Sequence, residues 1–178
     1  MKGNHYRYSL LTIIATFCLF SCSNQRAKSL KEQLDEKERK ANDIVLSEKG
    51  TEAQKLDYII AERYDSALVV TARQQIQFDS IIRDLEAFPA DGLEGATEVK
   101  RTAVQYYQAL QTLYGYSKKE VIQQQMLQRA SADDQKELQD GLLTLAKQKQ
   151  GLFEDVYKAE ADFSKANTAF EKKHQLTP

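Results

Sequence analysis

The sequence predicts an all-α protein: an elongated antiparallel bundle of three long helices, with a shorter, charged helix before them and coiled-coil-like packing. Three observations predict this class. After the first two dozen residues the chain is rich in Gln, Glu, Lys, Ala and Leu, which favour helix. No stretch alternates apolar and polar residues as a half-buried strand does. Only two prolines occur in 178 residues, and apolar residues recur at spacings of three and four.

The first 22 residues have the organisation of an export signal. Lys2 and Arg7 precede an apolar run over 10–20, and the small residue Ser21 stands before Cys22. A charged start, a short apolar segment and a small residue before the cleavage point are typical of secretory signals. The apolar run falls short of the roughly 20 residues that a bilayer-spanning helix needs.

The Leu-Phe-Ser-Cys ending of this segment, residues 19–22, resembles the lipobox of bacterial lipoproteins. The resemblance covers residues 1–22 only. It implies that residues 1–21 are a signal peptide that is removed, and that Cys22 is acylated and becomes the new N-terminus. Such an anchor carries two or three acyl chains, and two chains hold a protein stably on a membrane where one does not.

Two residues around this cysteine refine the resemblance. Phe20 departs from the smaller residue that the family prefers at its position. Ser23 stands where an Asp can signal retention in the inner membrane of some bacteria. The resemblance therefore implies a location in the cell envelope, on the outer membrane of a two-membrane cell and facing the periplasm.

Cleavage after residue 21 would leave 157 of the 178 residues, a length that suits one domain. Two of the 25 basic residues leave with the signal, so the formal net charge changes from −1 to −3. This balance gives no basis for binding nucleic acid, which requires a concentrated basic surface. The only two cysteines are Cys18, within the signal, and Cys22, so no disulfide is available to the mature chain.

Residues 22–28 are predicted to be the acylated cysteine and a short polar tether, followed by the bundle domain, residues 29–178. A first helix is predicted over 29–49, which is heavily charged, with Gly50 as the C′ glycine that ends it. We expect this helix to lie on the side of the bundle or to project toward the membrane. Its thin apolar stripe consists of Leu30, Leu34, Ala41, Ile44 and Val45.

A second helix is predicted from Thr51, where Thr51-x-x-Gln54 resembles a capping box, to Phe88, where the segment from Phe88 to Gly92 forms a turn. Its apolar and small residues follow a heptad-like spacing with a polar middle. The positions are Ile60, Tyr64, Ala67, Thr71, Gln74, Phe78, Ile81, Leu85 and Phe88.

A third helix is predicted between the turn at Gly92 and a short connection at Ala130–Ser131. Its pattern loses phase over 114–117, and Ser117-x-x-Glu120 resembles another capping box. We expect a kink there rather than a break, because a break would cut one of three rods of matched length. The patterned positions are Val99, Ala103, Tyr106, Leu110 and Leu113, and then Val121 and Ile122.

A fourth helix is predicted to open at Ser131-x-x-Asp134 and to continue to about His174. Its pattern is the most regular in the chain, and such a run predicts a left-handed supercoiled seam. The positions are Leu138, Leu142, Leu145, Lys149, Leu152, Val156, Ala159, Phe163, Ala166 and Phe170. Each of the last three helices would be on the order of 55 to 65 Å long, and the short connections between them predict antiparallel neighbours.

The inventory of reactive groups argues against catalysis. Past Cys22 the chain has no cysteine and one histidine, His174, four residues from the end. Glu171-x-x-His174 matches half of the ligand set of a di-iron bundle, but the second motif that this chemistry needs is missing, so we interpret it as an exposed tail. Asp, Glu, Lys and Tyr remain as general acids or bases, without visible clustering. No cofactor, no metal and no enzymatic activity are expected.

Polar residues within the predicted seams form the candidate site. Antiparallel register places Lys149 at the level of Tyr114 and of Asp65, and Thr71 and Gln74 interrupt the second helix. A lysine beside a carboxylate and phenols between helices could bind a small ligand. The alternative is a polar layer that fixes register, in which the lysine extends outward.

Two residues are the expected partners of Lys149 in that alternative, namely Asp65 and Glu62. Glutamine is in excess along the helices. Its side chains either recognise a glycan strand or a partner helix, or simply favour helix on a solvated face.

Together these observations predict a membrane-anchored envelope lipoprotein that acts as a non-catalytic structural or protein-interaction rod. Its expected partners are the membrane, through the lipid anchor, and an envelope protein or a second copy of the chain. The alternative function is a small-ligand-binding bundle with a polar site around Lys149, Tyr114 and Gln74.

Overall fold

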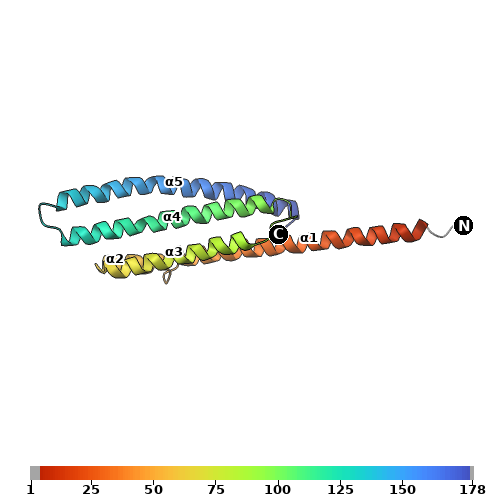
Figure 1. The fold of residues 1–178 in the computed structure, drawn as a ribbon, viewed down its shortest axis with the longest axis horizontal. Helices are drawn as coiled ribbons and strands as arrows, with labels where there is room; N and C mark the ends of the chain where they lie inside the picture. Colours follow the sequence, from red (N-terminus) through yellow and green to blue (C-terminus); the bar gives the residue numbers. More distant parts are fainter. Residues whose placement is uncertain (1–4, 177–178) are drawn as a thin grey trace.

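The computed structural model describes the backbone of residues 5–176 and the side chains of residues 24–176. The described residues form five helices and no strand (Figure 1). The predicted all-α class and the helical bundle are confirmed. The helices are α1 His5–Val45, α2 Thr51–Ile60, α3 Tyr64–Ala87, α4 Ala96–Arg129 and α5 Gln135–His174. The predicted signal peptide and Cys22 lie outside the residues whose side chains are described, so they remain predictions.

The helices form an elongated antiparallel arrangement in which α1 and α2 together make one rod (Figure 1). Both run antiparallel to α3: Lys37 of α1 reaches Asp84, and Thr51 of α2 reaches Gln77. From α3 to α5 the chain runs back and forth through short connections, as the sequence predicted. The bend over residues 46–50 separates α1 from α2 without reversing the chain.

The second predicted helix, over 51–88, is wrong as one element, because the chain reverses direction at residues 61–63. Glu62 adopts the left-handed conformation with φ of 57°, and the N–H of Arg63 donates to the carbonyl of Tyr58 at 2.8 Å. The residue at positive φ after a helix is usually glycine, so the glutamate at this position did not indicate the end of a helix. Ile60 therefore lies at a turn, 81% exposed, instead of within a seam.

The structure continues α1 through the segment that was expected to be a tether. Residues 23–28 are helical, and Ala27 is completely buried. The predicted stripe from Leu30 to Ile44 is buried in the bundle core, so α1 packs alongside the other helices rather than projecting away from them over this stretch. Lys37, 3% exposed, occupies the seam position between the apolar residues of the stripe.

Helix α4 runs without a break through residues 114–117. Ser117 is 3% exposed and continues the seam to Val121, which is fully buried. The loss of phase inferred from the sequence is therefore wrong: a small polar residue occupies a seam position. A break of the third helix is excluded by the same observation.

The starts of α2 and α5 are close to the predicted positions, but the predicted capping boxes do not form. Gly50 is the N-cap of α2, and the Thr51 hydroxyl donates instead to the Gln77 side chain at 2.9 Å. At α5 the N-cap is Asp134, whose carboxylate accepts a hydrogen bond from the Ser131 hydroxyl at 2.7 Å. The starts of these two helices were predicted closely, whereas the predicted side-chain hydrogen bonds to their first turns are absent.

The α5 seam faces the bundle along its whole length, but only Val156 and Phe170 are buried. The other eight predicted seam positions of α5 are half-buried. This helix packs mainly on α4, and it contacts α1 only toward its C-terminal half, where Lys31 pairs with Glu171 at 3.1 Å.

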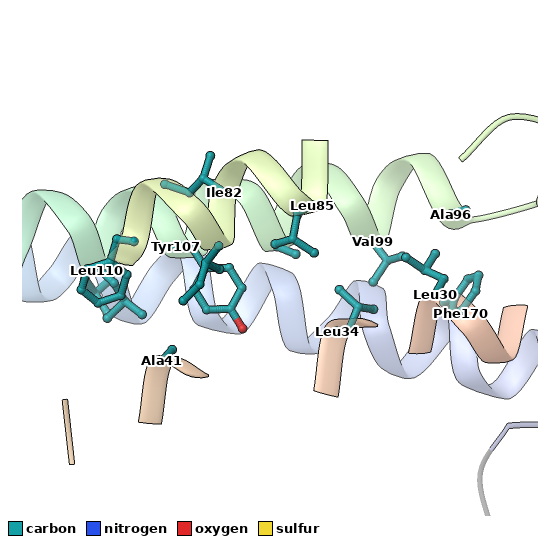
Figure 2. Close-up of a cluster of buried hydrophobic side chains, with 14 of the residues drawn as sticks. Leu30, Leu34, Ala41, Ile82, Leu85, Ala96, Val99, Tyr107, Leu110 and Phe170 are labelled. Carbon is teal, nitrogen blue, oxygen red and sulfur yellow. The ribbon is translucent and has the colours of Figure 1, made fainter. Parts of the chain in front are cut away.

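The hydrophobic core is concentrated where α1, α3, α4 and α5 pack together (Figure 2). Side chains from all four helices meet there, which buries the apolar area that stabilises the fold. Among the buried core residues are Leu30, Leu34, Phe78, Ile81, Leu85, Val99, Ala103, Tyr107, Val156 and Phe170.

Candidate functional site

The structure divides the five predicted ligand-binding residues among three places. Thr71, Gln74 and Tyr114 lie together in the middle of α3 and α4. Asp65 lies at the start of α3, and Lys149 lies on α5. The sequence-based site is therefore not one site.

Lys149 pairs across the α4–α5 interface. Its ammonium nitrogen lies 2.7 Å from a carboxylate oxygen of Glu120, and about a quarter of the lysine side chain is exposed. The expected partners of this lysine are wrong: Asp65 accepts a hydrogen bond from Gln125 at 2.8 Å, and Glu62 accepts one from Gln128 at 2.6 Å.

A lysine that the sequence analysis missed occupies the centre of the polar region. Lys55 of α2 is 2% exposed, and its ammonium lies 2.7 Å from the Glu52 carboxylate. The same nitrogen donates to the Ser117 hydroxyl of α4 at 3.1 Å. Lysine is seldom fully buried unless it is paired, and this one has both a carboxylate and a hydroxyl.

Two of the predicted residues join this centre. The Gln74 amide donates to the Glu52 carboxylate at 3.0 Å, and the Tyr114 ring stacks on Phe78 with ring centroids 5.9 Å apart. Burial raises the pKa of Tyr114 to about 12, and the nearby Glu52 carboxylate adds to the effect. We call Glu52, Lys55, Gln74, Tyr114 and Ser117 the buried polar layer.

Thr71 takes no part in the hydrogen bonds of this layer. Its hydroxyl donates to the carbonyl of Ala67 at 2.8 Å, one turn earlier in α3. This bond satisfies a buried hydroxyl within its own helix. Thr71 therefore fills a seam position and needs no ligand.

The buried polar layer connects α2, α3 and α4 through side chains that must meet at one level. A buried ion pair of this kind adds little net stability, but it penalises any sliding of the helices that separates its members. The layer thus corresponds to the register-fixing alternative, built on Lys55 rather than on Lys149.

The excess of glutamine has a structural explanation. The Gln75 amide donates to the Gln111 carbonyl at 3.1 Å, and the Gln123 amide donates to the Leu138 carbonyl at 3.0 Å. Gly115 lies directly under the end of the Gln75 side chain, and Gly141 lies under that of Gln123. Glycines without a side chain let glutamines cross to the neighbouring backbone, which aligns α3 with α4 and α4 with α5.

Gln74 and Tyr114 were predicted from the sequence, whereas the only signal for Lys55 was its spacing. Lys55 stands four residues after Thr51, one helical turn further along the chain. Both residues lie on the buried side of α2. A charged residue at a seam position is commonly assigned to solvent, which is why both Lys55 and Lys37 were missed.

An apolar groove lies on the outer side of α3 and α4. It measures about 660 Å³, and Val69 and Ile76 stand beside it 62% and 64% exposed. We define the apolar groove by Leu68, Val69, Ala72, Ile76 and Gly115. Exposed apolar side chains gathered in one groove are typical of interaction surfaces.

No protein-family model, curated protein or solved structure matches this chain. Within the described residues, no group of three or more His, Cys, Asp or Glu side chains could hold a metal ion. No helix in that part of the chain is long and apolar enough to cross a membrane.

Proposed function

We propose that this protein is an envelope lipoprotein, anchored through acylated Cys22, that acts as a non-catalytic helical rod for interaction with another envelope protein. The apolar groove on α3 and α4 carries the interaction part of the proposal. Residues 69, 72 and 76 recur at spacings of three and four, so they form a stripe on α3 that the bundle leaves uncovered. The lipobox-like ending carries the anchoring part.

The path from the anchor to the core supports a rigid attachment. Ala27 is fully buried and belongs to the same helix as residues 23–26. Five residues of helix span only about 8 Å, so a lipid on Cys22 would hold the bundle directly at the bilayer surface. The groove would then stand at a fixed height above the membrane, as suits a partner fixed in the same envelope.

The buried polar layer supports the non-catalytic part. The Lys55 ammonium pairs with the Glu52 carboxylate at 2.7 Å and donates a hydrogen bond to the Ser117 hydroxyl at 3.1 Å. Lys55 and Ser117 are both buried, so these groups are engaged with one another rather than open to a substrate. The alternative of a small-ligand site around Lys149, Tyr114 and Gln74 has no such support, since Lys149 pairs with Glu120 on another face of α4.

Metabolic labelling with palmitate tests the anchor, and the chain provides its own matched control. We expect Cys22→Ser to lose the label and to leave the membrane fraction, whereas Cys18→Ser keeps both. Equal labelling of the Cys22→Ser variant and of wild type would contradict the proposal.

Site-specific photocrosslinking in intact cells tests the interaction. A photoreactive residue at Val69 or Ile76 should give one discrete adduct with another envelope protein, while the same residue at Glu154, exposed on α5, should give none. Adducts only between two copies of the chain would assign the groove to self-association. The absence of an adduct at both groove positions would remove the groove from the proposal.

A further inference from the structure

A second hollow lies on another face of the bundle, between α1, α4 and α5. It measures about 310 Å³, at the small end of the range for ligand pockets. We call it the aromatic cleft and define it by Glu38, Tyr106, Tyr107, Glu160, Phe163 and Asn167. These residues come from three helices, so the cleft exists only in the assembled bundle.

Three aromatic rings gather at the cleft. The Tyr106 ring stacks on Phe163 with centroids 5.9 Å apart, and Tyr107 lies 5.1 Å from Tyr106 and 6.5 Å from Phe163. Such rings offer an apolar surface to a hydrocarbon chain and a negative face to a cation.

Two polar atoms in the cleft lack a partner. Tyr107 is completely buried, and its hydroxyl makes no hydrogen bond. Figure 2 shows this hydroxyl directed away from Ile82 and Leu85 of α3, toward the side where α1 lies. The carbonyl oxygen of Asn167 is also buried and unpaired.

The orientation of the Asn167 amide follows from its other neighbour. Its NH₂ group donates to the Glu171 carboxylate at 3.0 Å, and a carboxylate accepts only. The free atom must therefore be the carbonyl oxygen. An unpaired buried polar group costs stability, so a hydrogen bond from an incoming donor to either oxygen would recover part of that cost.

The charged residues that line the cleft have one sign. Glu38 and Glu160 line it, and no lysine, arginine or histidine is among its lining residues. Burial raises the pKa of Tyr106, and the negative charges of Glu160 and Glu38 raise it further. The cleft thus offers acceptors, negative charge and aromatic faces together.

We propose that the aromatic cleft binds a small organic ammonium ion, a primary amine or diamine on a short aliphatic chain. One ammonium donates hydrogen bonds to the Tyr107 hydroxyl oxygen and to the Asn167 carbonyl oxygen. Glu38 and Glu160 balance its charge, and the hydrocarbon chain lies on the rings of Tyr106 and Phe163. A neutral alcohol of the same length lacks the charge, and an anion is repelled. This site is separate from the proposed anchor and from the apolar groove.

Calorimetric titration of the full-length protein in a non-ionic detergent tests the ligand class. The probe is 1,5-diaminopentane, and 1,5-pentanediol is its neutral counterpart. We expect saturable binding of the diamine and at least about tenfold weaker binding of the diol, since hydrogen bonds to charged groups are stronger than neutral ones. Equal binding of the two, or no saturation with the diamine, overturns the proposal.

Charge variants locate the site. Glu160→Gln should weaken diamine binding by about three- to tenfold, while Glu154→Gln, a nearby exposed residue of α5 outside the cleft, should leave it unchanged. Equal weakening by both variants would show general attraction to an acidic surface and would overturn the proposal.

Tyr107→Phe separates binding from folding. Removing an unpaired buried hydroxyl should leave the unfolding temperature equal or higher while it weakens diamine binding about threefold or more. Tyr157→Phe, on a side chain that is 64% exposed, should change neither. If Tyr107→Phe lowers the unfolding temperature, or leaves binding intact, the hydroxyl does not serve a ligand and the proposal fails.

Discussion

The heptad pattern of α5 extends through two regions of the bundle that differ in how many helices cover it. In the four-helix region, α1 from residue 24 to 45 packs against α3, α4 and α5, and both buried residues of α5 lie there. In the hairpin region, formed by α4 over 118–129 and α5 over 135–152, α5 contacts α4 and the same pattern stays half-buried. The cause is the bend over 46–50, after which α2 follows α3 rather than α5 (Figure 1). A regular seam thus specifies which face turns inward, and the path of the neighbouring chain decides how deeply it is buried.

Equivalent leucine truncations in the two regions should show the largest difference. Leu34→Ala, at a site 2% exposed in the four-helix region, should lower the free energy of unfolding by about 3 kcal/mol, because the cavity has neighbours on every side. Leu145→Ala, at a half-buried site in the hairpin region, should lower it by about 1 kcal/mol, since only part of the side chain leaves water on folding.

Urea denaturation of both variants, followed by helical circular dichroism, gives the two values. If Leu34→Ala cost no more than Leu145→Ala, α1 would be a loosely attached arm, and the four-helix region would not be the stable part of the molecule.

The two lysine–glutamate pairs provide the next comparison. Lys55→Met leaves Glu52 without its ammonium in a site that is mostly buried, and should lower the free energy of unfolding by about 2 kcal/mol. Lys149→Met breaks a pair in which each side chain is about a quarter exposed, and should cost less than about 1 kcal/mol.

A double variant isolates the cause of the first effect. Adding Glu52→Gln to Lys55→Met should restore most of the lost stability, because no unpaired charge then remains. If the double variant stayed as unstable as Lys55→Met alone, the loss would come from packing rather than from charge.

Features that depend on nearby residues could be predicted from the sequence, whereas features that depend on the path of distant helices could not. Helical composition and spacing fixed the class, most helix ends and the inward face of α5, because these depend on residues close together in the chain. The turn at Glu62 could not be predicted, since its left-handed residue is not a glycine. The sequence did not show how deeply α1 is buried, because a helix so rich in charge was expected on the side of the bundle or projecting toward the membrane. Lys37 is nevertheless buried, and it pairs with Asp84 of α3 at 2.7 Å.

The candidate site failed for a related reason. Counting residues from the turns placed Lys149 and Tyr114 at the same height along the bundle axis. Two residues at the same height can still lie on different faces of α4, so the count did not show whether they meet. Lys149 reaches Glu120, while Tyr114 faces Lys55, a residue on a helix whose separate existence the sequence did not indicate. The contacts between α2, α3 and α4 could be predicted only with knowledge of the bend over 46–50 and the turn over 61–63, which set the path of the chain.

Glycine substitutions test the contribution of the close glutamine crossings. Gly151 has open space where a Cβ would be added, so Gly151→Ala should raise the free energy of unfolding by about 0.5 to 1 kcal/mol through helix propensity. At Gly115 an added Cβ would lie 2.8 Å from the Gln75 side-chain oxygen. Gly115→Ala should therefore show no gain, because it displaces the amide that bonds Gln111. Thermal unfolding measures both variants. An equal gain in stability at Gly115 and Gly151 would show that the hydrogen bond from Gln75 to Gln111 contributes nothing to stability.

The smallest expected effect is the pH dependence of the link between α1 and α3. The Lys37 ammonium beside Asp84 lowers the pKa of that carboxyl below 3.8, with nearby Lys40 and Arg83 adding to the effect. A carboxyl with a lowered folded-state pKa stabilises the fold fully above its unfolded pKa, and this contribution is lost as the pH falls through the folded value.

Asp84→Asn should therefore unfold at a slightly lower temperature than wild type at pH 7, and the difference should shrink as the pH falls from about 5 to below 3. Because nearly half of the Asp84 side chain is exposed, solvent screening keeps the difference small. A difference that stayed constant over this pH range would mean that Asp84 acts through its shape rather than its charge, and Lys37 would then depend on Glu36 alone for its charge balance.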